Sequence, residues 1–159
     1  MDCLILPCSQ RKRDPRTLRN HTYDDVTGAP IAPAWAVYNG PLVQIARKYA
    51  PYRELDVMFL SARFGLIDWT YMIPLYDQKM TIGQITDEWV GTRVTVPWMR
   101  YESYCKTVYT CLPRLYKVAL AAGLAPFGVK PAAIQMSYGQ GYMSKYLKQF
   151  CLEWRQCHR

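Results

Sequence analysis

Two short apolar runs, separated by an amphipathic segment, most limit what this chain can fold into. Residues 3–7 read CLILP and residues 55–61 read LDVMFLS, so each run has the length of a buried strand. Between them, Pro41 suits the first turn of a helix and Pro51 ends it. Apolar residues recur inside this helix at helical spacing: Leu42, Ile45, Ala46 and Tyr49. This order predicts a βαβ unit, hence an at least partly parallel sheet with the first run as a central strand.

The rest of the chain predicts an α/β fold, a small sheet flanked by helices. A third strand is expected at 132–136, followed by a terminal helix from about Tyr142 to Trp154. The region between the second and third strands is expected to be mostly helical, with a capped start at Thr86 and a C-terminal stop at Gly123. Residues 9–33 show no clear period and are expected to form a long loop.

The length indicates one domain. With 159 residues the chain can bury a core without staples, so we treat residues 1–159 as a single domain. Residues 1–80 are expected to form the α/β part that carries the site. Residues 81–159 are expected to form a basic, aromatic-rich helical part with the last strand and helix.

Positive charge is concentrated in the last part of the chain. Residues 100–159 hold nine Lys or Arg against two Asp or Glu, whereas residues 1–99 hold eleven against ten. This asymmetry favours a polyanionic partner, nucleic acid first, although a basic surface that only aids solubility would give the same count. Tyrosines and tryptophans alternate with these charges, which suits either base stacking or a packed helical bundle.

The cysteines and the hydropathy bear on metals, redox state and location. Six cysteines and two histidines are present, and no cysteine pair has CxxC spacing, so we expect no metal, no cofactor and reduced cysteines in a cytoplasmic protein. No apolar run has the length of a bilayer span, so we expect no membrane partner. The oligomeric state stays open.

Three segments should meet beyond the carboxyl ends of the predicted strands, where open α/β sheets bind ligands. They are residues 8–12, 61–66 and 137–141. In the first, Cys8 is either a nucleophile or a small half-buried residue, and Ser9 is expected to donate a hydrogen bond to a ligand because no nucleophile-elbow glycines surround it. The basic residues that follow suit phosphate contact or a solvated loop: Arg11, Lys12 and Arg13.

A carboxylate follows the second of these segments. Asp77 ends the sequence Ile-Pro-Leu-Tyr-Asp at residues 73–77, and Pro74 stiffens it. A carboxylate there can act as a general base or stabilise a positively charged sugar, and it can equally cap the next turn.

Four motifs together resemble a known family. They are Pro7-Cys8-Ser9-Gln10-Arg11-Lys12, Pro33-Ala34 with Tyr38-Asn39-Gly40-Pro41-Leu42, Leu60-Ser61-Ala62-Arg63-Phe64-Gly65-Leu66, and Pro74-Leu75-Tyr76-Asp77. Their order resembles a domain of uncharacterised phage and bacterial proteins, and it is similar to the catalytic region of archaeosine synthase. The wider group includes the bacterial peroxide-stress protein with its DNA-binding α/β fold. The resemblance covers residues 3–80 and is weak beyond them.

This resemblance implies a fold that handles modified nucleobases in nucleic acid. Archaeosine synthase acts on a modified base of transfer RNA, and small relatives in defence loci resemble DNA glycosylases that remove hypermodified bases from phage genomes. Two departures stand out: Leu75 separates Pro74 from Tyr76, and Lys12 is followed by Arg13-Asp14 where archaeosine synthase has Pro-Tyr. They argue against transfer chemistry and leave the fold expectation unchanged.

The resulting hypothesis is a DNA glycosylase that removes a bulky modified base, such as glucosylated hydroxymethylcytosine, and leaves an abasic site. Asp77 would stabilise the positive sugar, while Lys12 would hold a phosphate or form a Schiff base with the sugar. The remaining substrate-binding candidates are Cys8, Ser9, Tyr38, Asn39, Ser61, Arg63, Gly65, Tyr76 and Gln140. Contacts to the DNA backbone are assigned to Arg11, Arg13, Lys130 and Lys145.

Two alternatives stay open. The protein could exchange or decorate a base in tRNA or DNA, which requires a second substrate. It could also bind nucleic acid without catalysis, with a steep salt dependence and no product.

Overall fold

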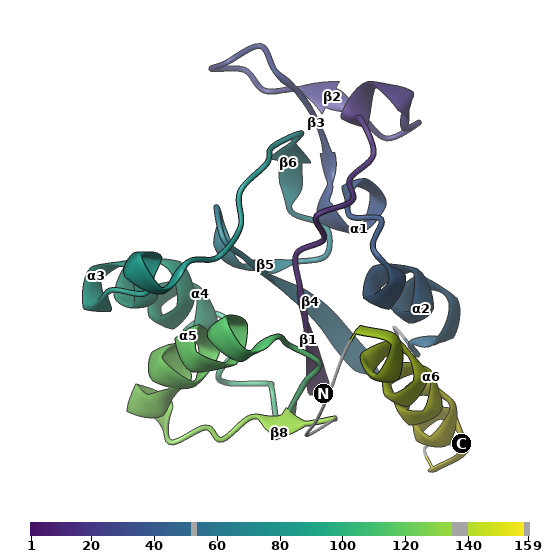
Figure 1. Cartoon of the computed structure of the whole chain (residues 1–159), viewed down its shortest axis with the longest axis vertical. Coiled ribbons are helices and arrows are strands. Elements are labelled where there is room, and N and C mark those ends of the chain that lie inside the picture. Colours follow the sequence, from purple (N-terminus) through teal and green to yellow (C-terminus); the bar gives the residue numbers. More distant parts are fainter. Residues whose placement is uncertain (52–53, 135–139, 158–159) are drawn as a thin grey trace.

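The chain folds around one mostly parallel sheet, which confirms the expected α/β class. The computed structural model describes residues 1–51, 54–134 and 140–157. The sheet has the order β5-β4-β1-β7-β8 (Figure 1). Its strands are β1 (Asp2–Pro7), β4 (Leu55–Ser61), β5 (Gly65–Asp68), β7 (Val108–Thr110) and β8 (Ala132–Ala133). All neighbours pair in parallel except β5, which returns antiparallel along β4.

The central strand β1 is buried on both faces, as predicted. Leu4 and Leu6 pack into one core with α2 (Pro41–Tyr49) and α6 (Gln140–Cys157). Cys3 and Ile5 point into a second core. A parallel strand covered by helices on both sides has to be apolar throughout, which is why its sequence shows no alternation.

The second core lies under a group of shorter helices. They are α3 (Asp87–Val90), the π-helical turn Gly91–Thr95, α4 (Val96–Trp98), α5 (Arg114–Leu124) and the 3-10 turn Ala125–Phe127. Figure 1 shows them on one side of the sheet, with α2 and α6 on the other. The predicted cap of α3 is confirmed, because the Thr86 hydroxyl accepts a hydrogen bond from the Trp89 backbone N–H at 3.2 Å.

The segment that we expected to be a loop, residues 9–33, contributes two strands to a small antiparallel sheet. Its strands, in the order β2-β3-β6, are β2 (Thr22–Tyr23), β3 (Pro30–Pro33) and β6 (Met72–Pro74). The 3-10 turn Pro15–Thr17 precedes it, the short helix α1 (Ala34–Val37) follows β3, and the 3-10 turn Ile82–Gln84 lies beyond β6. Figure 1 shows this sheet at the end of the molecule towards which β1 runs. These strands have two to four residues and depend on pairing with distant segments.

Four sequence expectations were incomplete or wrong. The region expected to be mostly helical also contains β7, and the last strand is β8 at Ala132–Ala133, with residues 135–139 outside the described part. Gly123 does not end a helix: it lies inside α5, where a Cβ would collide with the side chain of Val94. Cys3 and Cys105 form a disulfide, because the pairing of β1 with β7 brings their Cα atoms to 6.0 Å.

Other expectations are confirmed or refined. The helix begins at Pro41 and the second strand covers residues 55–61, as predicted, while the terminal helix is longer than expected. Some aromatic side chains of the basic part are packed in the core and others are free to stack on a ligand. Trp98 is fully buried, whereas Tyr142 and Tyr146 are exposed on α6. No helix within the described ranges is long and apolar enough to cross a membrane.

We predict that Gly123→Ala destabilises the protein although alanine favours helices. The added methyl group collides with Val94 in a filled core, which costs about 1–3 kcal/mol. Gly91→Ala is the matched control, because Gly91 is helical and a Cβ there meets no atom within 4 Å. That variant should gain about 0.5–1 kcal/mol. Urea unfolding measures both, and equal effects of the two substitutions would contradict this packing.

Candidate functional site

The strand order creates a crevice between β1 and β7. The connection from β1 to β4 carries α2 on one face of the sheet, and the connection from β7 to β8 carries α5 on the other. The two crossovers leave β1 and β7 in opposite directions, so neither crossover covers the carboxyl ends of these two strands. Ligands of open α/β proteins bind at such a reversal of strand order.

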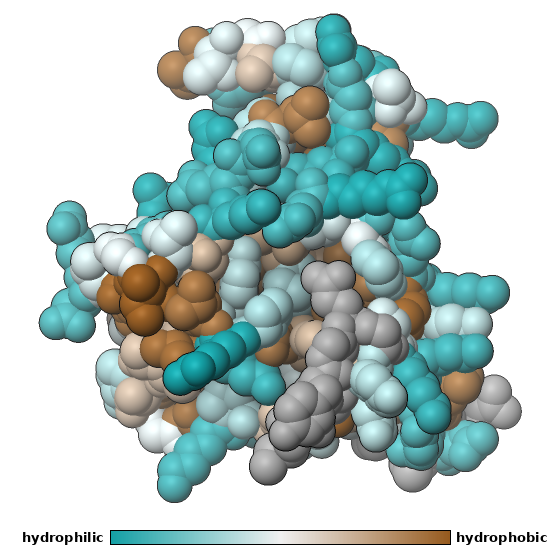
Figure 2. Space-filling view, viewed as in Figure 1, coloured by the Kyte–Doolittle hydropathy of each residue, from teal (hydrophilic) through white to brown (hydrophobic). Residues whose placement is uncertain are grey.

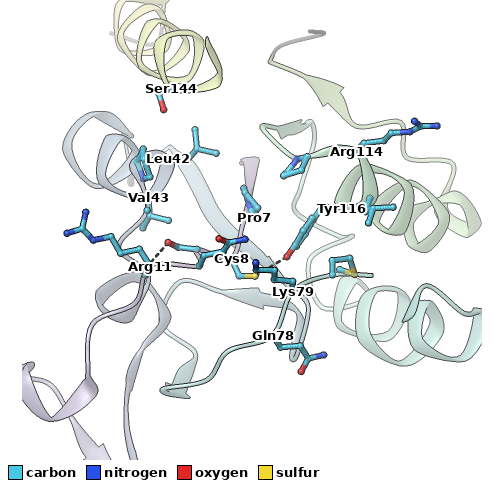
Figure 3. Close-up of a pocket in the computed structure, with 17 residues that line it drawn as sticks. Pro7, Cys8, Arg11, Leu42, Val43, Gln78, Lys79, Arg114, Tyr116 and Ser144 are labelled. Carbon is cyan, nitrogen blue, oxygen red and sulfur yellow. Dashed lines mark hydrogen bonds between the residues drawn. The ribbon is translucent and has the colours of Figure 1, made fainter. Parts of the chain in front are cut away.

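A cavity of about 590 Å³ opens at this point. Its walls come from the end of β1 and the residues after it, the first turns of α2 and α5, residues 78–80, and Ser144 of α6 (Figure 3). Pockets that bury small ligands have volumes of roughly 300–1,000 Å³. This cavity is therefore large enough for a ligand the size of a substituted nucleobase.

The cavity walls combine apolar side chains with positive charge. Leu42, Val43, Met80 and Leu115 supply apolar surface. The charged side chains among the described lining residues are all cationic: Arg11, Lys79 and Arg114. The helices α2 and α5 begin at the cavity, so their free backbone N–H groups add partial positive charge. A flat ligand that carries or adjoins negative charge fits these walls.

Beside the cavity, three hydroxyl groups form a buried network, which we call the hydroxyl cluster: Tyr38, Ser61 and Tyr76. The Tyr76 hydroxyl lies 2.5 Å from that of Tyr38 and 2.9 Å from that of Ser61. The Ser61 oxygen also accepts the backbone N–H groups of Arg63 and Phe64. Both its lone pairs are therefore used, so Ser61 donates to Tyr76 and Tyr76 donates to Tyr38. Burial raises the pKa of both tyrosines, which keeps them protonated.

Lys12 lies on this cluster. Its backbone pairs with that of Tyr38, and its Nζ lies 4.3 Å from the centre of the Tyr76 ring and 6.0 Å from that of Tyr38. Burial lowers the Lys12 pKa, and the charges of Cys8 and Asp77 act in the opposite direction. Lys12 is thus a half-buried amine held over an aromatic ring, with the Asp77 carboxylate in its electrostatic range.

Cys8 lies in the cavity wall, in electrostatic range of Tyr38 and Tyr76 of the hydroxyl cluster. Its Sγ lies 3.3 Å from the hydroxyl of Tyr116 on α5 (Figure 3). Burial is the main cause that raises the pKa of Tyr116, so this hydroxyl is not a base. Cys8 also interacts electrostatically with Lys12. Its assignment as a nucleophile or as a half-buried wall residue stays a prediction.

The structure brings only part of the predicted site together. Cys8, Ser9 and Arg11 line the cavity, and the Ser9 hydroxyl donates to the Arg11 carbonyl oxygen at 2.7 Å. Lys12, Tyr38, Ser61 and Tyr76 form the adjoining cluster. Asp77 is exposed, and the next two residues along the chain, Gln78 and Lys79, are part of the cavity wall.

The other predicted site residues in the described part of the chain are not among the residues that line the cavity. The Arg63 guanidinium lies 5.7 Å from the centre of the Tyr76 ring. Asn39 accepts from the side chain of Gln44 at its backbone carbonyl. Gly65 has a φ of +78°, and a Cβ there would strike the Arg93 backbone, so it shapes a turn and not the cavity wall. Arg13, Lys130 and Lys145 are exposed, and the side chain of Gln140 lies outside the described part.

Sequence reasoning missed the wall formed by α5. Arg114, Leu115 and Tyr116 follow β7, so they reach the cavity only because that strand pairs with β1. The available signal was Pro113 ahead of an apolar helical segment, after the short run Val-Tyr-Thr. Lys79 and Ser144 have no signal of their own in the sequence.

No family model, curated protein or solved structure matches this chain. The interpretation of the site therefore depends on its geometry.

We predict that Tyr76→Phe loses stability out of proportion to the atom removed. The variant leaves the Tyr38 and Ser61 hydroxyls buried without this partner, which costs about 1–3 kcal/mol. Tyr104→Phe is the matched control, because its hydroxyl is at the surface and bonds Asp56 at 3.3 Å. Chemical unfolding of the two variants compares them. Similar small losses would mean that the hydroxyl cluster contributes nothing.

Proposed function

We propose that this protein is a DNA glycosylase that hydrolyses the N-glycosidic bond of a bulky modified base in phage DNA, as an antiviral defence. The observation that carries the proposal is the cavity of about 590 Å³ with apolar and cationic walls, next to the Lys12–Asp77 pair. A base that is turned out of a duplex needs such a pocket, with flat apolar surface for the ring and polar groups for its edge.

The walls supply each of these contacts. Leu42 and Leu115 offer apolar surface for the ring, and Gln10 offers an amide group to its polar edge or to a sugar substituent. The cations Arg11, Lys79 and Arg114 suit the phosphates that flank an extruded nucleotide. The volume favours a substituted base, because a plain pyrimidine would leave much of this cavity empty.

Asp77 supplies the charge that the reaction requires. As the glycosidic bond breaks, positive charge develops on the sugar, water adds to its C1′ atom, and the base leaves with a proton. A carboxylate near this sugar stabilises the charge and orients the water. Asp77 is adjacent in sequence to the cavity wall, and its exposed position allows the sugar of an inserted nucleotide to approach it.

A basic surface lies on the helices that flank the cavity. On α2 and α6, the ammonium groups of Lys48 and Lys148 lie 5.3 and 5.2 Å from the centre of the Tyr49 ring. Lys145 is exposed on α6 and follows Ser144 of the cavity wall. We assign this surface to the DNA backbone, together with Arg13. Lys130 precedes β8, which is parallel to β7, so it lies at the amino-terminal edge of the sheet, away from the cavity, and is not assigned to this contact.

The first test is substrate discrimination. We expect base release from DNA with glucosylated hydroxymethylcytosine and at least 10³-fold slower release from plain cytosine DNA, because the polar groups of the cavity stay unpaired with the smaller base. Mass spectrometry of released bases and alkaline cleavage at abasic sites measure this, with hydroxymethylcytosine DNA as the intermediate case. DNA binding with a steep salt slope and no released base from any of the three would refute catalysis in favour of a binding role.

The second test removes the carboxylate. Asp77→Asn should fold and bind modified DNA, and base release should fall about 10²-fold or more, because the positive sugar loses its counter-charge. Asp25→Asn is the matched control, since Asp25 is an exposed carboxylate in the turn between β2 and β3. Single-turnover base release with saturating protein separates chemistry from binding. Near-normal release by Asp77→Asn would remove Asp77 from the mechanism.

A further inference from the structure

We propose that Lys12 gives the protein a second activity, cleavage of the DNA strand at an abasic site through a Schiff base with the sugar. This inference rests on the proposed function, because an abasic site is the product of base release. It extends that function from removing a base to breaking the strand.

Lys12 differs from most other lysines of the chain in its burial. Within the described ranges, Lys12 and Lys117 are the only lysines that are not exposed, and Lys117 lies on α5 in electrostatic range of Cys111. The backbone of Lys12 is held by its bridge to Tyr38, and its Nζ by the ring of Tyr76. The amine is therefore fixed in place, with less of the conformational freedom of a surface lysine.

The surroundings place this amine next to the proposed reaction. Arg11, the preceding residue, lines the cavity, and so does Cys8, whose charge interacts with Lys12. The charge of Asp77 reaches Lys12 as well. A sugar close enough to Asp77 for charge stabilisation would present its C1′ atom to the same small region.

The amine must lose its proton before it can attack. Burial favours the neutral form of Lys12 and lowers its pKa, although the Cys8 and Asp77 charges offset part of this effect. Enzymes that use lysine as a nucleophile lower its pKa in this way, by removing water from around the amine.

The reaction balances without a cofactor or oxidant. The Lys12 amine adds to the C1′ aldehyde of the ring-opened abasic sugar, and water leaves as the C=N bond forms. The iminium acidifies the C2′ hydrogen, which is transferred to the Asp77 carboxylate. The C3′–O3′ bond then breaks, and the 3′ phosphate leaves as the 5′ end of the downstream strand. Water finally hydrolyses the imine, releasing the unsaturated sugar and the free amine.

The test supplies the abasic site directly, so that it does not depend on base release. A duplex with one uracil is treated with a uracil-DNA glycosylase, purified and incubated with the whole protein, with and without borohydride. Borohydride reduces the imine to a stable amine. We expect a covalent protein–DNA adduct, with peptide mass spectrometry placing it on Lys12, and a cleaved strand in the sample without borohydride.

Variants distinguish this role from binding. Lys12→Arg keeps the charge and the ring contact but cannot form a Schiff base, so the adduct should fall at least 100-fold. Lys106→Gln, an exposed lysine far along the chain, is the matched control and should form the adduct at the wild-type level. If Lys12→Arg fails to fold, the adduct position on the wild-type protein still decides the question.

The outcomes are separable. An adduct on another lysine, or none at all, overturns the inference, and base release from modified DNA then decides the proposed function by itself. An adduct on Lys12 without base release from any modified DNA supports the strand-cleaving activity and refutes the glycosylase.

Discussion

The pairing of β1 on both of its edges is the constraint on which the rest of the structure depends. Parallel neighbours β4 and β7 satisfy its backbone groups, and its side chains belong to two separate cores. Because the strand is covered on both faces, its side chains from Cys3 to Leu6 are fully buried. The carboxyl end of this strand is consequently held rigidly, and residues 8–11 enter the cavity from it.

The hydroxyl cluster joins the end of β4 in the main sheet to segments next to the small antiparallel sheet. Ser61 ends β4 of the main sheet, whereas Tyr38 follows α1 and Tyr76 follows β6 of the small sheet region. Hydrogen bonds among three buried hydroxyls therefore join segments that the main sheet does not hold together. Lys12 lies on this junction, so the amine is positioned by both parts of the fold. Figure 2 shows hydrophilic side chains across the middle of this face, beside the small sheet, in keeping with a polar ligand.

Sequence reasoning succeeded where a pattern is local. The strands β1 and β4 and the helix α2 are visible because their apolar spacing and prolines act within one short window. It failed where an element depends on distant pairing: β7 has three residues and forms because β1 lies beside it. Gly123 shows the same limit, because its role comes from Val94 and not from its place in a helix.

The candidate site follows the same division. The rule that ligands bind beyond strand ends placed Cys8, Ser9 and Arg11 at the cavity, since it needs only the position of β1. The α5 wall was missed because its position follows from β7. The resemblance selected Tyr38 and Tyr76, and the strand-end rule had already selected Ser61, but their shared hydrogen bonds arise only in the folded chain. The catalytic role of Asp77 stays a prediction, because neither the strand-end rule nor the hydrogen bonds of the hydroxyl cluster bear on it.

The exposure of Asp77 bears on how specificity and catalysis would be linked. Two unit charges 4 Å apart interact by about 1 kcal/mol in water and by about 4 kcal/mol where the effective dielectric constant is near 20. An exposed carboxylate therefore stabilises a positive sugar only weakly until water is displaced. In the described part of the chain Asp77 is exposed, so a nucleotide that fills the cavity would have to displace the water around it. A base too small for the cavity would leave water around both groups, and discrimination would then act on the rate of bond breaking as well as on binding.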